Sequence, residues 1–167
     1  IHEEAIRLTR LLDDLLDLSV LENGAVQLNV GVASIQQLLD RALASASHTR
    51  PERSFVIFRD LPAENIFVRT DADRLVQVFI NVISNARKYC DAVAPEIKIT
   101  VRQRSGRISV DFVDNGSGIP KESQGLIFEK FARLTDQTRA GGAGLGLAIC
   151  REVMANLGGT IGYPILR

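Results

Sequence analysis

The chain has no excess of either charge. Its 20 Lys and Arg residues balance 20 Asp and Glu residues, so the formal net charge is zero. Proteins that capture nucleic acid or an anionic membrane surface by long-range electrostatics carry a basic excess. We therefore expect no nucleic-acid partner. The 46% of apolar residues and 24% of charged residues are ordinary for a globular protein with a substantial core.

Cysteine is scarce and long apolar runs are missing. Cys90 and Cys150 lie far apart, outside any metal-ligand spacing, which favours a reduced, cytoplasmic setting. No apolar run approaches the roughly 20 residues of a membrane-spanning helix, and no signal peptide is visible. The sequence opens without Met and inside a helical pattern, so we expect a soluble piece of a longer protein. Whether that parent is anchored in a membrane stays open.

An amphipathic helix is predicted over residues 2–22, ended by Asn23-Gly24 because glycine accepts a left-handed helix end. One interpretation is a helix packed on its own domain. The other is part of a helical dimerisation bundle, which the coiled-coil-like rhythm favours. The apolar stripe consists of Ala5, Leu8, Leu11, Leu12, Leu15, Leu18 and Leu21.

Strands and helices alternate irregularly over the rest of the chain. The third helix begins after Thr70 or Asp71, either of which suits a helix N-cap. The absence of a steady strand–helix–strand repeat favours the α+β class, with helices on one face of a mostly antiparallel sheet, over a doubly wound sheet. The expected strands are 26–30, 54–59, 66–69, 97–103, 107–113 and 160–163, and the expected helices after the first are 34–47, 71–88 and 144–157.

The segment NVISNARKY, residues 81–89, puts a polar row on a predicted helix. Asn81, Asn85 and Lys88 fall on one side of it. Asparagine is a poor helix former, whereas an amide oxygen suits Mg²⁺ and a lysine suits phosphate. The alternative is a solvated face that happens to contain asparagine. The residues at core spacing are Leu75, Val78, Phe79, Val82 and Ala86.

Two glycine-rich segments follow. DNGSGIP, residues 114–120, places a carboxylate at a strand end before glycines that let a flat ligand approach; a simple turn is the alternative, and Ile-Pro-Lys at 119–121 does not fit a calcium loop. AGGAGLGLAI, residues 140–149, runs into a helix whose free N–H groups suit phosphate, although the glycines could simply be hinges. Between them, IFEKFAR (127–133) is either a basic cover over a ligand or a short amphipathic helix.

Taken in their order along the chain, the four segments resemble the N, first glycine, F and second glycine boxes of the catalytic ATP-binding domain of two-component sensor histidine kinases. That domain is of the Bergerat or GHKL type. The resemblance covers about residues 34–163. Residues 1–23 look like the end of the second helix of that family's dimerisation and phosphoacceptor domain. Residues 24–167 would then be the catalytic domain, a two-layer α/β sandwich with a mobile ATP lid at about 119–143.

The resemblance implies ATP and Mg²⁺ as ligands. Asn85 would bind the metal, and Tyr89 would lie near the adenine. Asp114 would accept the adenine amino group, which fits because a carboxylate rejects the guanine carbonyl at that place. The residues implied for nucleotide binding are Asn81, Asn85, Lys88, Tyr89, Asp114, Gly116, Gly118, Ile119, Gly142, Gly144, Leu145, Gly146 and Leu147. Those implied for catalysis are Asn81, Lys88, Lys130 and Arg133, with Arg139 as a further lid cation.

The reaction implied is γ-phosphoryl transfer to a histidine on the dimerisation domain of a homodimeric parent, for relay to a response regulator. Such transfer needs mainly positioning and charge neutralisation. This chain departs from the family because neither His2 nor His48 carries the phosphoacceptor pattern, so we expect binding of ATP without self-phosphorylation in cis. In addition, CDAVAPE (90–96) replaces a shorter Thr-Pro turn.

Two other functions compete with this one. Hydrolytic ATPases of the same fold, as in gyrase, mismatch-repair and Hsp90-type proteins, normally carry an acidic residue on the N-box helix to activate water. Here Glu is absent from 72–88, and positions 81 and 85 are both Asn. The third possibility is a nucleotide-sensing scaffold without catalysis.

Overall fold

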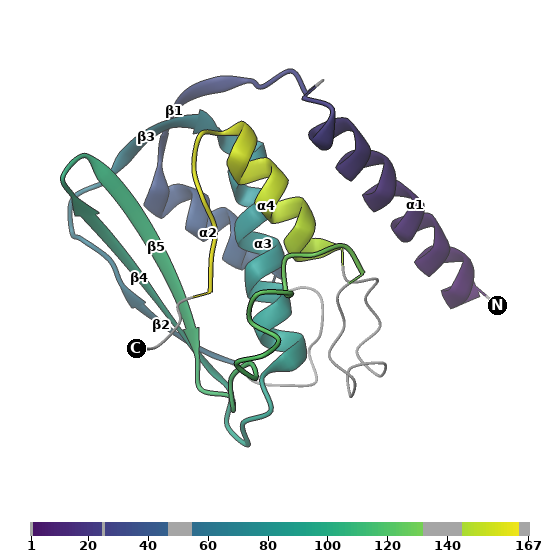
Figure 1. Ribbon diagram of the computed structural model, residues 1–167. Coiled ribbons are helices and arrows are strands. Elements are labelled where there is room, and N and C mark those ends of the chain that lie inside the picture. Colours follow the sequence, from purple (N-terminus) through teal and green to yellow (C-terminus); the bar gives the residue numbers. More distant parts are fainter. Residues whose placement is uncertain (1, 25, 47–54, 132–144, 164–167) are drawn as a thin grey trace. The chain divides into compact units, whose positions relative to one another are not determined.

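A computed structural model describes residues 2–24, 26–46, 55–131 and 145–163. The chain divides into two compact units (Figure 1). The sheet unit is Asn29–Gly118, and the helical unit combines Ile1–Leu28 with Ile119–Arg167.

The sheet unit contains two helices and two small sheets. Antiparallel β1 and β3 form one sheet, and the other has the order β2-β4-β5, in which β4 pairs parallel with β2 and antiparallel with β5. The bounds are β1 Val30–Ser34, α2 Ile35–Ala46, β2 Val56–Asp60, β3 Phe67–Asp71, α3 Ala72–Tyr89, β4 Glu96–Arg104 and β5 Arg107–Asp114.

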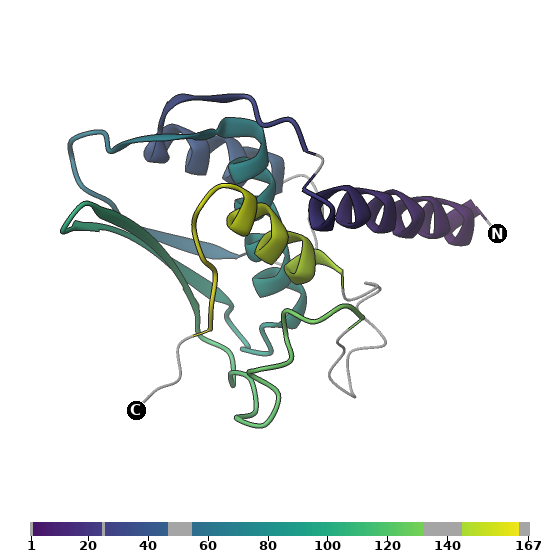
Figure 2. The same ribbon diagram turned by 45° about the horizontal axis from the view of Figure 1, so that its top comes forward.

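Both helices of the sheet unit cover the same face of the three-stranded sheet. Arg59, Ile99 and Phe112 are in register across β2, β4 and β5, so their side chains share one face. Arg59 forms an ion pair with Asp40 of α2, and the Phe112 ring lies 5.8 Å from the Phe79 ring of α3. Figures 1 and 2 show this arrangement of α2 and α3. The predicted α+β class with helices on one face is confirmed.

The core of the sheet unit follows the period of each element. On β4, Ile97, Ile99 and Val101 are buried, whereas Lys98 and Arg102 are exposed; Thr100 departs from the alternation because it is buried as well. On α3, the buried side chains are Leu75, Val76, Val78, Phe79 and Ile83. Val82 and Ala86, expected in the core, are only half-buried because the buried stripe is centred one position away, on Phe79 and Ile83.

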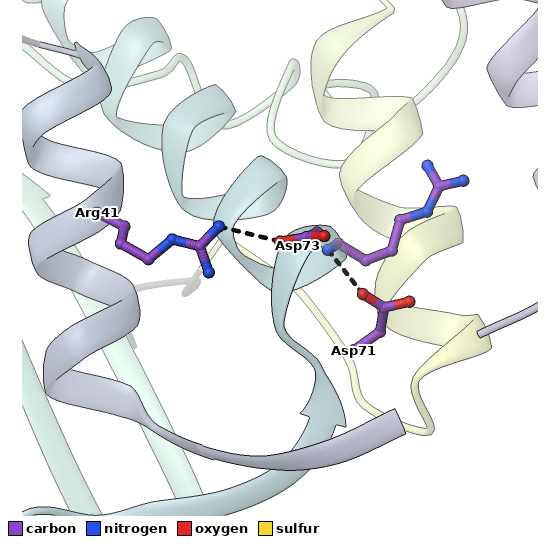
Figure 3. Close-up of polar contacts among 4 residues, drawn as sticks. Arg41, Asp71 and Asp73 are labelled. Atoms are coloured by element: carbon purple, nitrogen blue, oxygen red, sulfur yellow. Dashed lines mark hydrogen bonds and ion pairs between the residues drawn. The ribbon is translucent and has the colours of Figure 1, made fainter. Parts of the chain in front are cut away.

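Asp71 fixes the start of α3. Its Oδ1 accepts a hydrogen bond from the Arg74 N–H at 3.2 Å, which caps the helix, and its Oδ2 accepts one from the Asn29 N–H at 2.9 Å. The sequence allowed Thr70 or Asp71 as the cap, and the structure selects Asp71. Figure 3 shows the capping bond of Asp71 beside the exposed ion pair between Arg41 and Asp73.

The helical unit consists of α1 (His2–Glu22), a series of turns over 119–131 and α4 (Gly146–Asn156). Helix α1 packs on α4, where the Asn156 amide donates to the Leu21 carbonyl, and Leu18 and Leu21 in the last turns of α1 are both buried. Gly24 ends α1 with a φ of 64°, as predicted. No helix in the described part of the chain is long and apolar enough to span a membrane.

Two strand predictions were wrong. The strand placed at 26–30 begins only at Val30, and residues 160–163 form no strand. Strands β2 and β3 follow each other along the chain but pair in different sheets. Alternation along a few residues detects extended chain, but it does not determine which distant strand completes the hydrogen bonds.

Candidate functional site

The polar row of α3 is present on the helix. Asn81 and Asn85 are half-buried, while Lys88 and Tyr89 are exposed. Asn81 and Lys88 already have interaction partners. The Asn85 amide, by contrast, has no hydrogen-bond partner among the described residues, which leaves a half-buried oxygen available to a ligand.

The C-terminal end of α3 packs against the DNGSG loop. The helix ends at Cys90, whose N–H bonds to the Ala86 carbonyl at 3.0 Å. A Cβ built on Gly116 would lie only 3.4 Å from the Cys90 Cα. Two segments that the sequence singled out independently, 81–89 and 114–118, therefore lie together in the sheet unit.

The loop is shaped around Asp114 at the end of β5. Its Oδ1 accepts a hydrogen bond from the Gly116 N–H at 2.8 Å. Its Oδ2 has no partner within the described ranges, and the residue is exposed. A Cβ at Gly116 would lie 3.0 Å from that Oδ1, so any larger residue would require the neighbouring carboxylates to shift. Gly118 has a φ of 84°, which favours glycine.

Asn115 fastens the 90–96 loop to the strand end. Its Oδ1 accepts from the Glu96 N–H at 2.8 Å, and its Nδ2 donates to the Ala94 carbonyl at 2.9 Å. The Cys90 thiol also donates to Oδ1, at 3.4 Å. The sequence analysis did not predict these contacts of Asn115, and the unusual length of CDAVAPE was the only signal for them.

Asp91 makes a second contact from the same loop. Its two oxygens accept from one residue, Oδ1 from the Ser117 N–H at 2.8 Å and Oδ2 from the Ser117 Oγ at 2.6 Å. The Ser117 hydroxyl, followed by its N–H, lowers the pKa of Asp91 below the ordinary 3.8, with a smaller opposing effect from desolvation. The carboxylate is therefore ionised at neutral pH.

The helical unit holds the other predicted site residues that the structure describes. The Ile119 N–H donates to the Tyr163 Oη at 3.4 Å. Leu145, the residue at the N-cap of α4, is buried and has no side-chain capping bond, while Gly146 and Leu147 in the first turn are half-buried. A Cβ at Gly146 would meet nothing within 4 Å, so close packing does not explain this glycine.

The expected lid cation Lys130 is paired with α1. Its Nζ lies 2.6 Å from the Glu22 Oε1. The neighbouring Glu129 lies 3.5 Å from an Arg151 nitrogen of α4. Residues 120–129 form successive turns, with hydrogen bonds from Ser123 to Pro120, Leu126 to Ser123 and Glu129 to Leu126. The alternative of a short amphipathic helix at 127–133 is not found over the described residues 127–131.

Four predicted residues lie outside the described part of the chain: Arg133, Arg139, Gly142 and Gly144. Within the described part, no three His, Cys, Asp or Glu side chains gather into a metal-ligand cluster. The metal ligand predicted from the sequence, Asn85, stays a prediction.

Curated relatives carry kinase names. Sensor protein kinase WalK of Staphylococcus haemolyticus (strain JCSC1435) is 35% identical over 165 residues, which are 96% of this chain and 26% of that protein. A WalK protein of Staphylococcus aureus is also 35% identical, and the match covers 39% of its length. This chain thus spans well under half of the curated relatives it matches.

Solved structures agree with these relatives. The histidine kinase AdeS of Acinetobacter baumannii matches with a TM-score of 0.78 and 27% identity, over 97% of this chain and 74% of that chain. Full-length ShkA in complex with AMPPNP matches with a TM-score of 0.82 and 28% identity, over 96% of this chain and 33% of that one. The family model for the "Histidine kinase-, DNA gyrase B-, and HSP90-like ATPase" matches residues 70–164. The resemblance to the ATP-binding domain of sensor histidine kinases is confirmed, and the chain belongs to the family of histidine kinase-, DNA gyrase B- and HSP90-like ATPases.

Proposed function

We propose that this chain is the catalytic part of a sensor histidine kinase, which binds ATP with Mg²⁺ and transfers the γ-phosphoryl group to a histidine. The observation that carries the proposal is the packing of the Asp114 loop against the end of α3. There, the Asp114 Oδ2 and the Asn85 amide have no hydrogen-bond partner among the described residues. An exposed carboxylate oxygen and a half-buried amide without such partners are suited to receive a ligand.

Asp114 is the residue proposed to recognise adenine. The bond from the Gly116 N–H to Oδ1 holds the carboxylate in one orientation and leaves Oδ2 to accept the exocyclic amino group. Guanine presents a carbonyl at the same position, which an ionised carboxylate repels. The absence of a Cβ at Gly116 and Gly118 lets the base approach the backbone, and Tyr89 provides an exposed ring near the end of α3.

Asn85 is the proposed protein ligand of Mg²⁺. A single amide fits this ion, because Mg²⁺ usually keeps several waters and is bound by one or two protein groups together with the phosphates of the nucleotide. When bound, the ion supplies charge neutralisation at the phosphates. Asn81 and Lys88 on the same row would contact the phosphates. The glycine segment is proposed to add backbone contacts, from Ile119, Gly142, Gly144, Leu145, Gly146 and Leu147.

Lys130 and Arg133 are the proposed catalytic cations. For Lys130 this requires release from Glu22. Both side chains of that ion pair are at least 36% exposed. Exposed ion pairs contribute only about 0–1 kcal/mol, so the pair can exchange for a phosphate at little cost.

The proposed acceptor is a histidine on a dimerisation domain of the parent protein, with a response regulator as the next recipient. Supporting it, α1 keeps Leu8, Leu12 and Leu16 more than half exposed although its last turns pack on α4. A helix with such a stripe is typical of a helical bundle, in keeping with a homodimeric parent. The boundary between that domain and the catalytic domain, placed after residue 23, stays a prediction.

Phosphoryl transfer is favoured over hydrolysis by the composition of α3. Its residues 72–89 include no Glu, and the positions facing the proposed site carry amides, which do not act as general bases for water. A nucleotide-sensing scaffold would bind ATP in the same way, so turnover separates it from the kinase.

Calorimetric titration with ATP and GTP in the presence of MgCl2 tests the proposal. Wild type is expected to prefer ATP. Asp114→Asn offers a donor as well as an acceptor, so this preference should relax, and ATP affinity should fall by roughly tenfold or more. Asn85→Ala should abolish the gain in affinity that Mg²⁺ confers. Asp73→Asn, an exposed acid in the first turn of α3, is the matched control. Unchanged affinity and base preference in Asp114→Asn would refute the assignment.

The transfer step needs a separate measurement. Radiolabelled ATP is incubated with this chain and with a helix pair that carries a phosphoacceptor histidine. Labelling of the helix pair supports the kinase. Steady phosphate release without the helix pair would instead identify a hydrolase, and binding without either turnover would identify a scaffold.

A further inference from the structure

A second carboxylate contacts the candidate adenine loop. Asp91 lies on the 90–96 loop and is not among the residues that the family resemblance implies. Both of its oxygens are used on one residue, since Oδ1 accepts from the Ser117 N–H and Oδ2 accepts from the Ser117 Oγ. This two-point contact fixes the Ser117 peptide more firmly than a single hydrogen bond would.

Asp114 and Asp91 accept hydrogen bonds from consecutive backbone N–H groups. The Gly116 N–H donates to Asp114, and the next N–H along the chain, that of Ser117, donates to Asp91. A Cβ at Gly116 would lie 3.0 Å from the Asp114 Oδ1 and 3.1 Å from the Asp91 Oδ1. Gly116 is thus enclosed between the two carboxylates, and rotation of its peptide planes is opposed on both sides.

The loop that carries Asp91 is itself held at both ends. At one end, Cys90 caps α3 through the Ala86 carbonyl. At the other end, Asn115 bonds to Ala94 and to Glu96. Asp91 therefore acts from a fixed position, and an orienting group must itself be fixed to transmit orientation.

We propose that Asp91 is a positioning residue for base recognition: by holding Ser117 it fixes the Gly116 peptide, which in turn orients the Asp114 carboxylate toward the adenine amino group. The inference rests on the proposed function of the 114–118 loop. It adds a residue from outside the four boxes to the determinants of nucleotide specificity. Without Asp91, the loop can rotate, and Asp114 presents its oxygens in more than one direction.

The test compares ATP and GTP affinities, because a loss of stability alone would not change their ratio in the folded protein. Asp91→Ala is expected to weaken ATP binding by roughly tenfold while GTP binding changes less, so the preference for ATP falls. Asp91→Asn keeps one acceptor for the Ser117 N–H and should give an intermediate ratio. Asp73→Ala and Asp73→Asn remove an equally charged, exposed acid from α3 and should leave the ratio at its wild-type value.

A double-mutant cycle with Ser117→Ala adds a second readout. If Asp91 acts through Ser117, the effects of Asp91→Ala and Ser117→Ala on the ATP preference should fall well short of additive. Full additivity would overturn the proposed route. Should Asp91→Ala not fold, Asp91→Asn and Ser117→Ala are compared by the same ratio, and a wild-type ratio in both would overturn the inference.

The two proposals fail differently. If Asp114→Asn relaxes base preference but Asp91→Ala retains it, the positioning role is wrong and the nucleotide site stands. If wild type itself binds neither nucleotide, the proposed function fails and the positioning role fails with it.

Discussion

Replacing Asp71 with Ala should destabilise the protein strongly, because this one carboxylate serves two backbone donors. The residue is only 6% exposed. Loss of the cap at Arg74 costs about 0.5–2 kcal/mol. Loss of a charged acceptor for the Asn29 N–H costs about 1.5–3 kcal/mol. Together these contacts, at 3.2 and 2.9 Å, predict a decrease of about 2–5 kcal/mol in the free energy of unfolding.

Thermal unfolding followed by circular dichroism measures this decrease. For a chain of this size, 1 kcal/mol corresponds to about 2–4 °C, so the Tm of Asp71→Ala should fall by about 4–20 °C. The matched control is Asp73→Ala, two positions on in the same helix end, whose side chain is 86% exposed and forms one surface ion pair with Arg41 (Figure 3). That change should cost no more than about 1 kcal/mol. Equal Tm values for the two variants would refute the reasoning.

Two further predictions concern single contacts. Because the folded pKa of Asp91 is below its ordinary 3.8, the stabilisation from its contact with Ser117 is complete above that pH and is lost as pH falls through the lower folded value. An NMR titration should find that Ser117→Ala raises the Asp91 pKa toward 3.8, and an unchanged midpoint would contradict the assigned cause. In the helical unit, Leu21→Ala should cost about 2–5 kcal/mol in urea unfolding, whereas Leu12→Ala, 53% exposed in α1, should cost far less; similar costs would show that Leu21 does not anchor α1.

The elements that the sequence predicted well are those whose signals are local. Helices α1 and α3 and the β4–β5 hairpin lie within two residues of expectation. Each of these elements has a boundary set by a residue at its end. Gly24 ends α1, Asp71 caps α3, and Ser105-Gly106 form the hairpin turn with φ angles of 53° and 76°. The errors at 26–30 and at 160–163 share another cause. They depend on which strand is available as a partner far along the chain, and no local pattern contains that information.

The candidate site was predictable where function conflicts with stability. Asparagines inside a helix and a glycine beside a strand-end carboxylate are poor choices for a core, so Asn85, Asp114 and Gly116 stood out in the sequence. Asp91 and Asn115 did not. Their contacts join a side chain to groups 26 and 19 to 25 positions away, and an acid or amide in a polar loop looks the same whether or not it finds such a partner.

The contacts around α3 also indicate how the work of the site is divided. Asp71 fastens its first turn and Asn115 fastens the loop after its last, both through hydrogen bonds to backbone groups. In the proposed function, recognition of the base depends on an element with little freedom to reorient, as discrimination between bases requires. Lys130 is different, since an exposed ion pair with Glu22 holds it, and the proposed function requires a phosphate to replace that partner. The proposed function thus assigns fixed hydrogen bonds to the recognition of the base and an exchangeable ion pair to the contact with phosphate.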